Sequence, residues 1–249
     1  MKSVASKIKP TSGFSHIFHQ FLMLLLPLLV FILVRMHFVQ MAAALILLSK
    51  WRMLAVRPRY WLSNIRANAV DITVGLSLLI FMAHSSSGSW QMVWMIAYAA
   101  WLLVIKPGSS VAKISLQALV SQVVGLMALF IAWGDAPLLI LVVLAWAVSY
   151  ISARHFFSNF DEPYTALFSQ AWGYFAGAVT WILGHWLLFY GSVSQPTLLL
   201  SVVGFGLGGL YYLDQKDRLS PLLRRQFVFI MVAIVIVVLA FSDWGDKTI

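Results

Sequence analysis

The sequence predicts an all-α, polytopic integral membrane bundle of eight or nine transmembrane helices, with the N-terminus in the cytoplasm and the C-terminus outside. Three observations predict this fold. Of the 249 residues, 61% are hydrophobic and only 10% are charged, whereas a soluble domain usually carries about 25% charged residues. The apolar residues form nine runs, and the lysines and arginines concentrate in alternate connections between these runs. A soluble protein of this size could not bury so much apolar surface, so the excess must face lipid.

The whole chain, residues 1–249, is predicted to be a single membrane domain. Its candidate spans lie near 17–34, 36–49, 68–84, 90–105, 114–133, 137–153, 165–190, 196–212 and 227–241. The first two are predicted to form a hairpin or a re-entrant pair that turns at 35–37. One continuous helix over 21–49, at about 1.5 Å per residue, would exceed the hydrocarbon core of about 30 Å. Pro27 predicts a kink in the first span.

The basic residues predict the orientation of the spans. The connections assigned to the outside, "HSSSGS", "GDA" and "GSVSQ", contain no lysine or arginine. Positive charge is retained in the cytoplasm during insertion, which predicts N-in, C-out. The basic residues that this topology places in the cytoplasm are 15 of the 17: Lys2, Lys7, Lys9, Lys50, Arg52, Arg57, Arg59, Arg66, Lys106, Lys113, Arg154, Lys216, Arg218, Arg224 and Arg225. The net charge of +9 therefore predicts contact with anionic lipid headgroups and not with nucleic acid.

Several kinds of chemistry find no support in the composition. The chain has no cysteine, which excludes disulfides, thiolate catalysis and cysteine-ligated metal. His37, His84 and His185 all map to the outer half of the predicted spans, but no two of them have the spacing of metal ligands. No connection exceeds about 20 residues, so no soluble catalytic domain fits between the spans. We therefore expect no catalytic residue, no cofactor and no metal site.

Three polar residues within spans are candidates for a substrate path. Asp71 lies near the cytoplasmic end of the third span, where a carboxylate is costly unless it has a partner or a water-filled cavity. Its expected partner is Arg66 or a basic residue of another cytoplasmic connection. Gln122 lies near the middle of the fifth span and Gln170 in the inner part of the seventh. The alternatives are an interfacial ion pair for Asp71 and hydrogen bonds between helices for the two amides.

Glycines and tryptophans give a packing pattern. Gly173 and Gly177 are four residues apart in the seventh span, and Gly204 and Gly208 are four apart in the eighth. Small residues at this spacing allow helices to approach closely, which predicts a close pair of the seventh and eighth helices. A separate stripe shares one face of the fourth helix and predicts either packing or a cavity wall. Its members are Trp90, Trp94, Tyr98 and Trp101.

The stretch "SARHFFSNFDEPY" is the only place where two acidic side chains are adjacent. Asp161 or Glu162 could act as a base or metal ligand beside Arg154 at the cytoplasmic face. The alternative is local. Acids and a proline favour a helix start, and a cation favours a helix end. On this second interpretation the stretch only closes the sixth helix and opens the seventh.

Residues 89–130 resemble the membrane domains of fusaric-acid-resistance proteins and aromatic-acid exporters. Trp90, Pro107, Lys113 and Gly125 match the outline of a Trp-initiated helix, a proline turn followed by a basic residue, and a helix with a small residue. Residues 89–130 make up about a sixth of the chain, and the resemblance implies an export function. The soluble cytoplasmic portion usual in those exporters has no counterpart in this sequence. Otherwise the chain resembles uncharacterised polytopic membrane proteins of bacteria.

These observations predict a multi-pass protein of the cell membrane, a permease or exporter subunit for a small solute, acting alone or in a homo- or hetero-oligomer. One alternative is a membrane enzyme acting on a lipid-linked phosphate at the cytoplasmic face. Its candidate residues are Arg57, Arg59, Arg154, Asp161 and Glu162. The other alternative is a non-catalytic membrane assembly or scaffold subunit. A transporter predicts a polar path across the bilayer, an enzyme predicts a one-sided polar pocket, and a scaffold predicts neither.

Overall fold

The computed structural model describes residues 13–160, 162–185, 189–190 and 193–241. These residues form an all-α bundle, as predicted. The α-helices are α1 (Gly13–Arg35), α2 (Val39–Leu48), α3 (Trp61–His84), α4 (Gly88–Ala100), α5 (Val111–Trp133), α6 (Leu138–Phe157), α7 (Thr165–Gly184), α8 (Gln195–Asp214) and α9 (Pro221–Ala240). Short elements join them: the 3-10 helices η2 (Trp51–Met53), η3 (Pro58–Tyr60) and η5 (Ser158–Phe160), the π-helix η4 (Trp101–Ile105), and the antiparallel strands β1 (Phe189–Tyr190) and β2 (Val193–Ser194).

The protein is a helical membrane protein. Within the described residues, six helices are long and apolar enough to cross a bilayer: Pro58–His84, Gly88–Ile105, Val111–Trp133, Leu138–Phe160, Gln195–Asp214 and Pro221–Ala240. The count of nine spans stays a prediction. The 10 residues of α2 make a helix of only about 15 Å, half the thickness of the hydrocarbon core.

The helices begin and end where local chemistry directs. α4, α5, α8 and α9 each start after a serine whose hydroxyl accepts a backbone N–H two or three residues into the helix, which satisfies one of the free donors of a helix start. Pro196 and Pro221 occupy the first turns of α8 and α9, where the missing N–H costs nothing. α1 and α2 form a hairpin whose turn contains His37 in the left-handed region, with φ of 62°.

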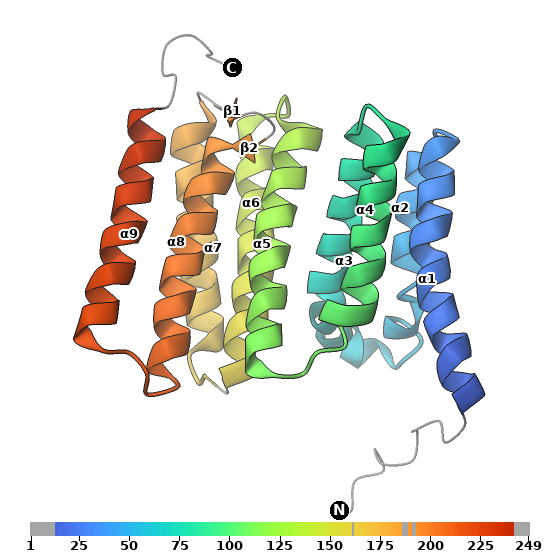
Figure 1. Ribbon diagram of the computed structural model, residues 1–249, viewed down its shortest axis with the longest axis horizontal. Helices are drawn as coiled ribbons and strands as arrows, with labels where there is room; N and C mark the ends of the chain where they lie inside the picture. Colours follow the sequence, from blue (N-terminus) through green and yellow to red (C-terminus); the bar gives the residue numbers. More distant parts are fainter. Residues whose placement is uncertain (1–12, 161, 186–188, 191–192, 242–249) are drawn as a thin grey trace, which may run out of the picture.

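The helices run side by side, with α1–α4 on one side of the bundle and α5–α9 on the other (Figure 1). The connections α2–α3, α4–α5, α6–α7 and α8–α9 lie at the same end, the lower end in Figure 1. We call it the basic end, because it carries Lys50, Lys106, Lys113, Arg154 and Lys216. Arg35 lies at the opposite end, in the turn between α1 and α2.

The core has two parts. One cluster belongs to α1–α4 and includes Val30, Ile46, Val74 and Met82. The other belongs to α5–α8 and includes Phe130, Leu141, Ala176 and Leu200. α9 has no buried residue and packs on α8 at the edge of the bundle (Figure 1), which fits the position expected for a helix whose surface faces lipid.

Candidate functional site

Asp71 lies in a buried charge cluster at the basic end of α3, with only 7% of its surface exposed. The indole Nε1 of Trp101 donates a hydrogen bond to its Oδ1 over 2.8 Å. The Nζ of Lys106 lies 2.6 Å from its Oδ2, and the Nζ of Lys50 pairs with the same oxygen. One carboxylate therefore bonds the side-chain nitrogens of two lysines and one tryptophan.

A π-helical turn brings two of these partners to the same side. The backbone N–H of Lys106 donates to the carbonyl of Trp101, five residues earlier, over 2.9 Å. In an α-helix, residues five apart point about 140° away from each other. The wider i→i+5 turn places them nearly above one another, and π-turns of this kind are frequent at functional sites. η4 therefore makes it possible for Trp101 and Lys106 to bond the same carboxylate.

The sequence-based expectation for Asp71 named two kinds of partner. Arg66, one turn nearer the start of α3, is exposed, and neither ion pair of Asp71 goes to it. Both partners come from other connections at the basic end: Lys50 follows α2, and Lys106 follows η4. The second alternative thus describes the structure. Sequence reasoning did not single out Lys50 or Lys106, and it placed Trp101 only in an aromatic stripe.

Gln117 supports the same turn from α5. Its Nε2 lies within hydrogen-bond distance of the carbonyl oxygens of Ile105 (2.7 Å), Lys106 (3.2 Å) and Gly108 (3.2 Å). Its Oε1 lies 2.9 Å from Nε2 of His155 on α6. Gln117 therefore links the end of η4, next to the Asp71 cluster, to α6.

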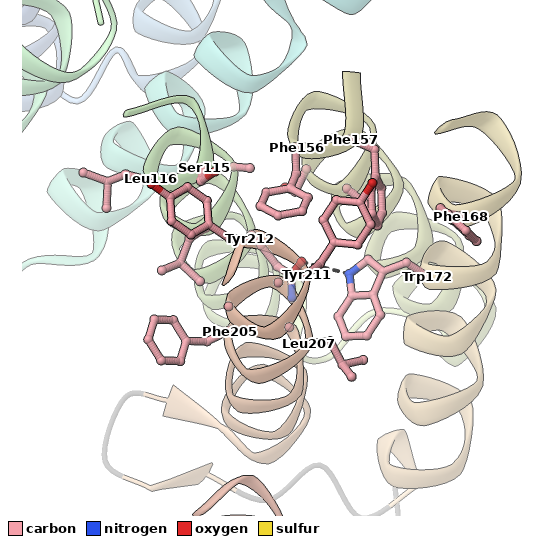
Figure 2. Close-up of a pocket in the computed structure, with 18 of the residues that line it drawn as sticks. Ser115, Leu116, Phe156, Phe157, Phe168, Trp172, Phe205, Leu207, Tyr211 and Tyr212 are labelled. Atoms are coloured by element: carbon pink, nitrogen blue, oxygen red, sulfur yellow. Dashed lines mark hydrogen bonds between the residues drawn. The ribbon is translucent and has the colours of Figure 1, made fainter. Parts of the chain in front are cut away.

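The second site is a cavity of about 870 Å³ between α5, α6, α7, α8 and α9. Aromatic side chains from four helices line it, and Figure 2 shows those of α6, α7 and α8. Phe156 and Phe157 come from α6, Trp172 from α7, and Tyr211 and Tyr212 from α8. Its volume falls in the range of sites that bind drug-sized molecules, about 300–1,000 Å³.

One amide gives this apolar cavity a polar point. Gln122 lines the cavity, accepts a hydrogen bond from Trp172 Nε1 over 2.9 Å (dashed in Figure 2), and donates to the carbonyl of Leu200 over 2.9 Å. An amide has two N–H donors and two acceptor lone pairs, so one of each is left over after these two bonds. Gly204 makes room for it, because a Cβ at 204 would lie 2.7 Å from Gln122 Nε2.

The three residues expected to form a path lie in different places. Asp71 is among the groups that join α2, α3 and η4. Gln122 is in the cavity, and Gln170 on α7 does not line it. The structure therefore does not bring Asp71, Gln122 and Gln170 together into one continuous path.

The four packing glycines also separate. A Cβ at Gly173 would lie 2.9 Å from the indole of Trp146, and one at Gly177 would lie 3.6 Å from Val142, so both glycines face α6 rather than α8. Gly204 faces Gln122, and Gly208 borders the cavity with its nearest neighbour 3.9 Å away. The expected close pair of α7 and α8 is replaced by a close pair of α6 and α7.

The aromatic stripe of α4 divides between packing and exposure. Tyr98 and Trp101 are 1% and 2% exposed, whereas Trp90 is 58% exposed. Trp94 packs on Phe81, with ring centroids 4.9 Å apart. Trp94, Tyr98 and Trp101 belong to the core of the α1–α4 half, and no member of the stripe lines the cavity.

The residues of the alternative enzyme site do not converge. Arg154 donates to the hydroxyl of its helix neighbour Tyr150 over 2.9 Å. Glu162 accepts from Tyr211 over 2.5 Å, which ties the α6–α7 connection to α8. Arg57 and Arg59 lie at η3, before α3, and Asp161 lies outside the described residues.

The histidines show no metal geometry in the part of the chain that the structure describes. His84 and His185 each place Nδ1 against a carbonyl of their own helix, at 3.0 and 2.8 Å. Among the described residues, no group of three or more histidine, aspartate or glutamate side chains could hold a metal ion.

Comparisons with known proteins add no further assignment, since no family model, no curated protein and no solved structure matches the chain. The likeness of residues 89–130 to exporter membrane domains therefore stays an expectation from sequence. What can be said of function depends on the cavity and on the Asp71 cluster.

Proposed function

We propose that this protein is a permease or exporter subunit of the cell membrane, and that it takes an amphiphilic organic anion with an apolar or aromatic body into the cavity between α5 and α9. The observation that carries the proposal is the cavity itself. It is large enough for a drug-sized molecule and its walls are almost entirely apolar and aromatic.

The polar groups of the cavity suit the headgroup of such a solute. Gln122 keeps one N–H and one lone pair after its bonds to Trp172 and Leu200, enough to orient a single polar group. Lys113 on α5 and Lys216 after α8 are both exposed at the basic end. Their positive charge adds long-range attraction for an anion. An amphiphile could therefore place its body among the aromatic rings and its charge toward the basic end.

The other functions have less support. An enzyme acting on a phosphate needs several charged groups in one pocket, and in the described residues Arg154 and Glu162 are each engaged with a tyrosine. A scaffold needs no cavity of this size. The transport proposal is the one that uses the cavity and its amide.

The test measures passage of 8-anilinonaphthalene-1-sulfonate across proteoliposomes. This amphiphilic anion fluoresces in apolar surroundings, so its slow fluorescence phase reports arrival at the inner leaflet. We expect the protein to accelerate this phase at least several-fold over empty vesicles. Ala171→Trp should abolish the acceleration, because Ala171 lines the cavity and an indole would fill it.

Ala178→Trp is the matched control. Ala178 lies two turns further along the exposed face of α7 and does not line the cavity. The indole of Ala178→Trp should therefore leave the passage rate unchanged. Equal rates in empty vesicles and in vesicles with the parent protein would contradict the proposal. Equal rates in the parent protein and Ala171→Trp would show that passage does not use this cavity.

A further inference from the structure

The Asp71 cluster carries more positive than negative charge. Two lysines bond one carboxylate oxygen, and within the described residues no second acidic group pairs with either lysine. The side chains of Lys50 and Asp71 are only 10% and 9% exposed, and that of Lys106 is 32% exposed. If both amines are protonated, one unit of charge is left without a partner in a mostly buried place, which is costly.

Among the described residues, the elements around the cluster supply no further negative charge. α4 adds Tyr98, a neutral phenol that is 1% exposed, and α5 adds the amide of Gln117. α1 contributes apolar Val30 and Val34 to the neighbouring core. On η2 and η3 the charged groups are the exposed Arg52, Arg57 and Arg59, which are positive too. Loss of one lysine proton is therefore the simplest way to balance the cluster.

Lys50 is the lysine that burial disfavours as a cation. Its pKa is lowered, first by desolvation and further by the neighbouring Lys106, while Asp71 acts in the opposite direction. The neutral amine keeps a lone pair that can accept a hydrogen bond from the ammonium of Lys106. Release of the proton thus leaves a neutral group of three side chains: Asp71 carboxylate, Lys106 ammonium and Lys50 amine.

We propose that Lys50, Asp71 and Lys106 form a proton-binding site that exchanges one proton with water at the basic end, and that its occupancy is linked to solute in the cavity. Proton exchange moves one proton between the Lys50 ammonium and water, with Lys106 as the most exposed member of the site. The second part of this inference rests on the proposed function.

A chain of polar contacts provides the link. Lys106 belongs to the site through its side chain, and its carbonyl accepts from Gln117 over 3.2 Å. Gln117 contacts His155 over 2.9 Å. Phe156 and Phe157, the next two residues of α6, line the cavity. A change in the position of Lys106 would reach the cavity wall through one amide and one imidazole.

The test measures the protonation of individual lysines in the purified full chain by competitive acetylation. Trace acetic anhydride is added over a pH series, and mass spectrometry gives the half-point for each lysine. We expect the half-point of Lys50 to lie below those of the exposed Lys113 and Lys216. Lys106→Met should raise the half-point of Lys50, because it removes the neighbouring positive charge.

Two arms separate the two parts of the inference. A Lys50 half-point equal to that of Lys216 would overturn the proton site. With 8-anilinonaphthalene-1-sulfonate present, the Lys50 half-point should shift in the parent protein and not in Ala171→Trp. A low half-point that the anion leaves unchanged would overturn the link and retain the proton site. A low half-point in a protein that shows no anion passage would count against the proposed function and not against the proton site.

Discussion

Asp71→Asn tests the charge cluster directly. The substitution keeps the shape of the side chain and removes its charge, so the Lys106 ammonium, and Lys50 when it is protonated, lose their counter-ion. At the 2.6 Å between Lys106 Nζ and Oδ2, the attraction is about 6 kcal/mol with an effective dielectric constant of 20. Repulsion between the lysines and the cost of desolvation cancel part of it.

We therefore expect Asp71→Asn to cost about 3–5 kcal/mol of unfolding free energy, the usual result of removing one partner from a buried ion pair. In a protein of this size such a loss lowers the melting temperature by roughly 6–20 °C. The measurement is thermal unfolding of the purified variant in detergent, together with its yield from the membrane. Asp135→Asn is the matched control, because Asp135 is exposed and its neutralisation should change little.

The triple variant Asp71→Asn, Lys50→Met, Lys106→Met removes the whole charge cluster and should recover most of the lost stability, since no buried charge is left unpaired. Two results would refute the reasoning. If Asp71→Asn is as stable as Asp135→Asn, the cluster is solvated and its ion pairs contribute little. If the triple variant is no more stable than Asp71→Asn, the loss does not come from unpaired charge.

Three further predictions concern orientation, packing and pH. Single cysteines placed at Ser87 and Asp135 should be labelled from outside, and single cysteines placed at Ser109 and Ser158 should be labelled from inside. Labelling of both groups from one side would contradict the predicted topology. Gly204→Ala should cost about 1–3 kcal/mol of unfolding free energy, because its Cβ would lie 2.7 Å from Gln122 Nε2 and displace a bonded amide. Gly208→Ala, with 3.9 Å of space, should be neutral or slightly stabilising. Thermal unfolding of both variants measures the difference. The pKa of Lys50 is lowered in the folded state, so between that pKa and about 10.5 the unfolded chain binds more protons than the folded protein. The stability of the parent relative to Lys50→Met should therefore rise with pH across this window. A stability difference that does not change with pH would contradict the lowered pKa.

The sequence predicted the helices well because apolar runs and their boundaries are local signals. Each of the nine runs overlaps a described helix, and the turn between α1 and α2 falls at Met36–Phe38, next to the predicted 35–37. The seventh run, 165–190, was too long, because α7 ends at Gly184 and residues 189–190 form β1. Asp71 also stands out locally, since a carboxylate in a predicted span is rare. These features need only a window of residues and a knowledge of what lipid excludes.

The partners of Asp71 and the lining of the cavity were not predictable in the same way. Lys50 and Lys106 are 21 and 35 residues from Asp71, and they meet it only because α2 is short and η4 is a π-turn. Neither fact leaves a mark in hydrophobic periodicity. Glycine spacing likewise shows that helices approach closely and does not show which helix is the partner, so Gly173 could be placed at an interface but not against Trp146 of α6.

The cavity exists because α8 is held to the bundle at a few points instead of along its whole length. Near its middle, Gly204 and Gly208 present no side chains, and the rings of Tyr211 and Tyr212 at its end cannot fill the space that this leaves. The polar contacts of α8 with its neighbours include Gln122 to the carbonyl of Leu200 and Tyr211 to Glu162. α9 packs on α8 and closes only one wall. Tightly packed interiors leave few voids larger than a water molecule, so the open part of the α8 interface is the place where the proposed solute would bind.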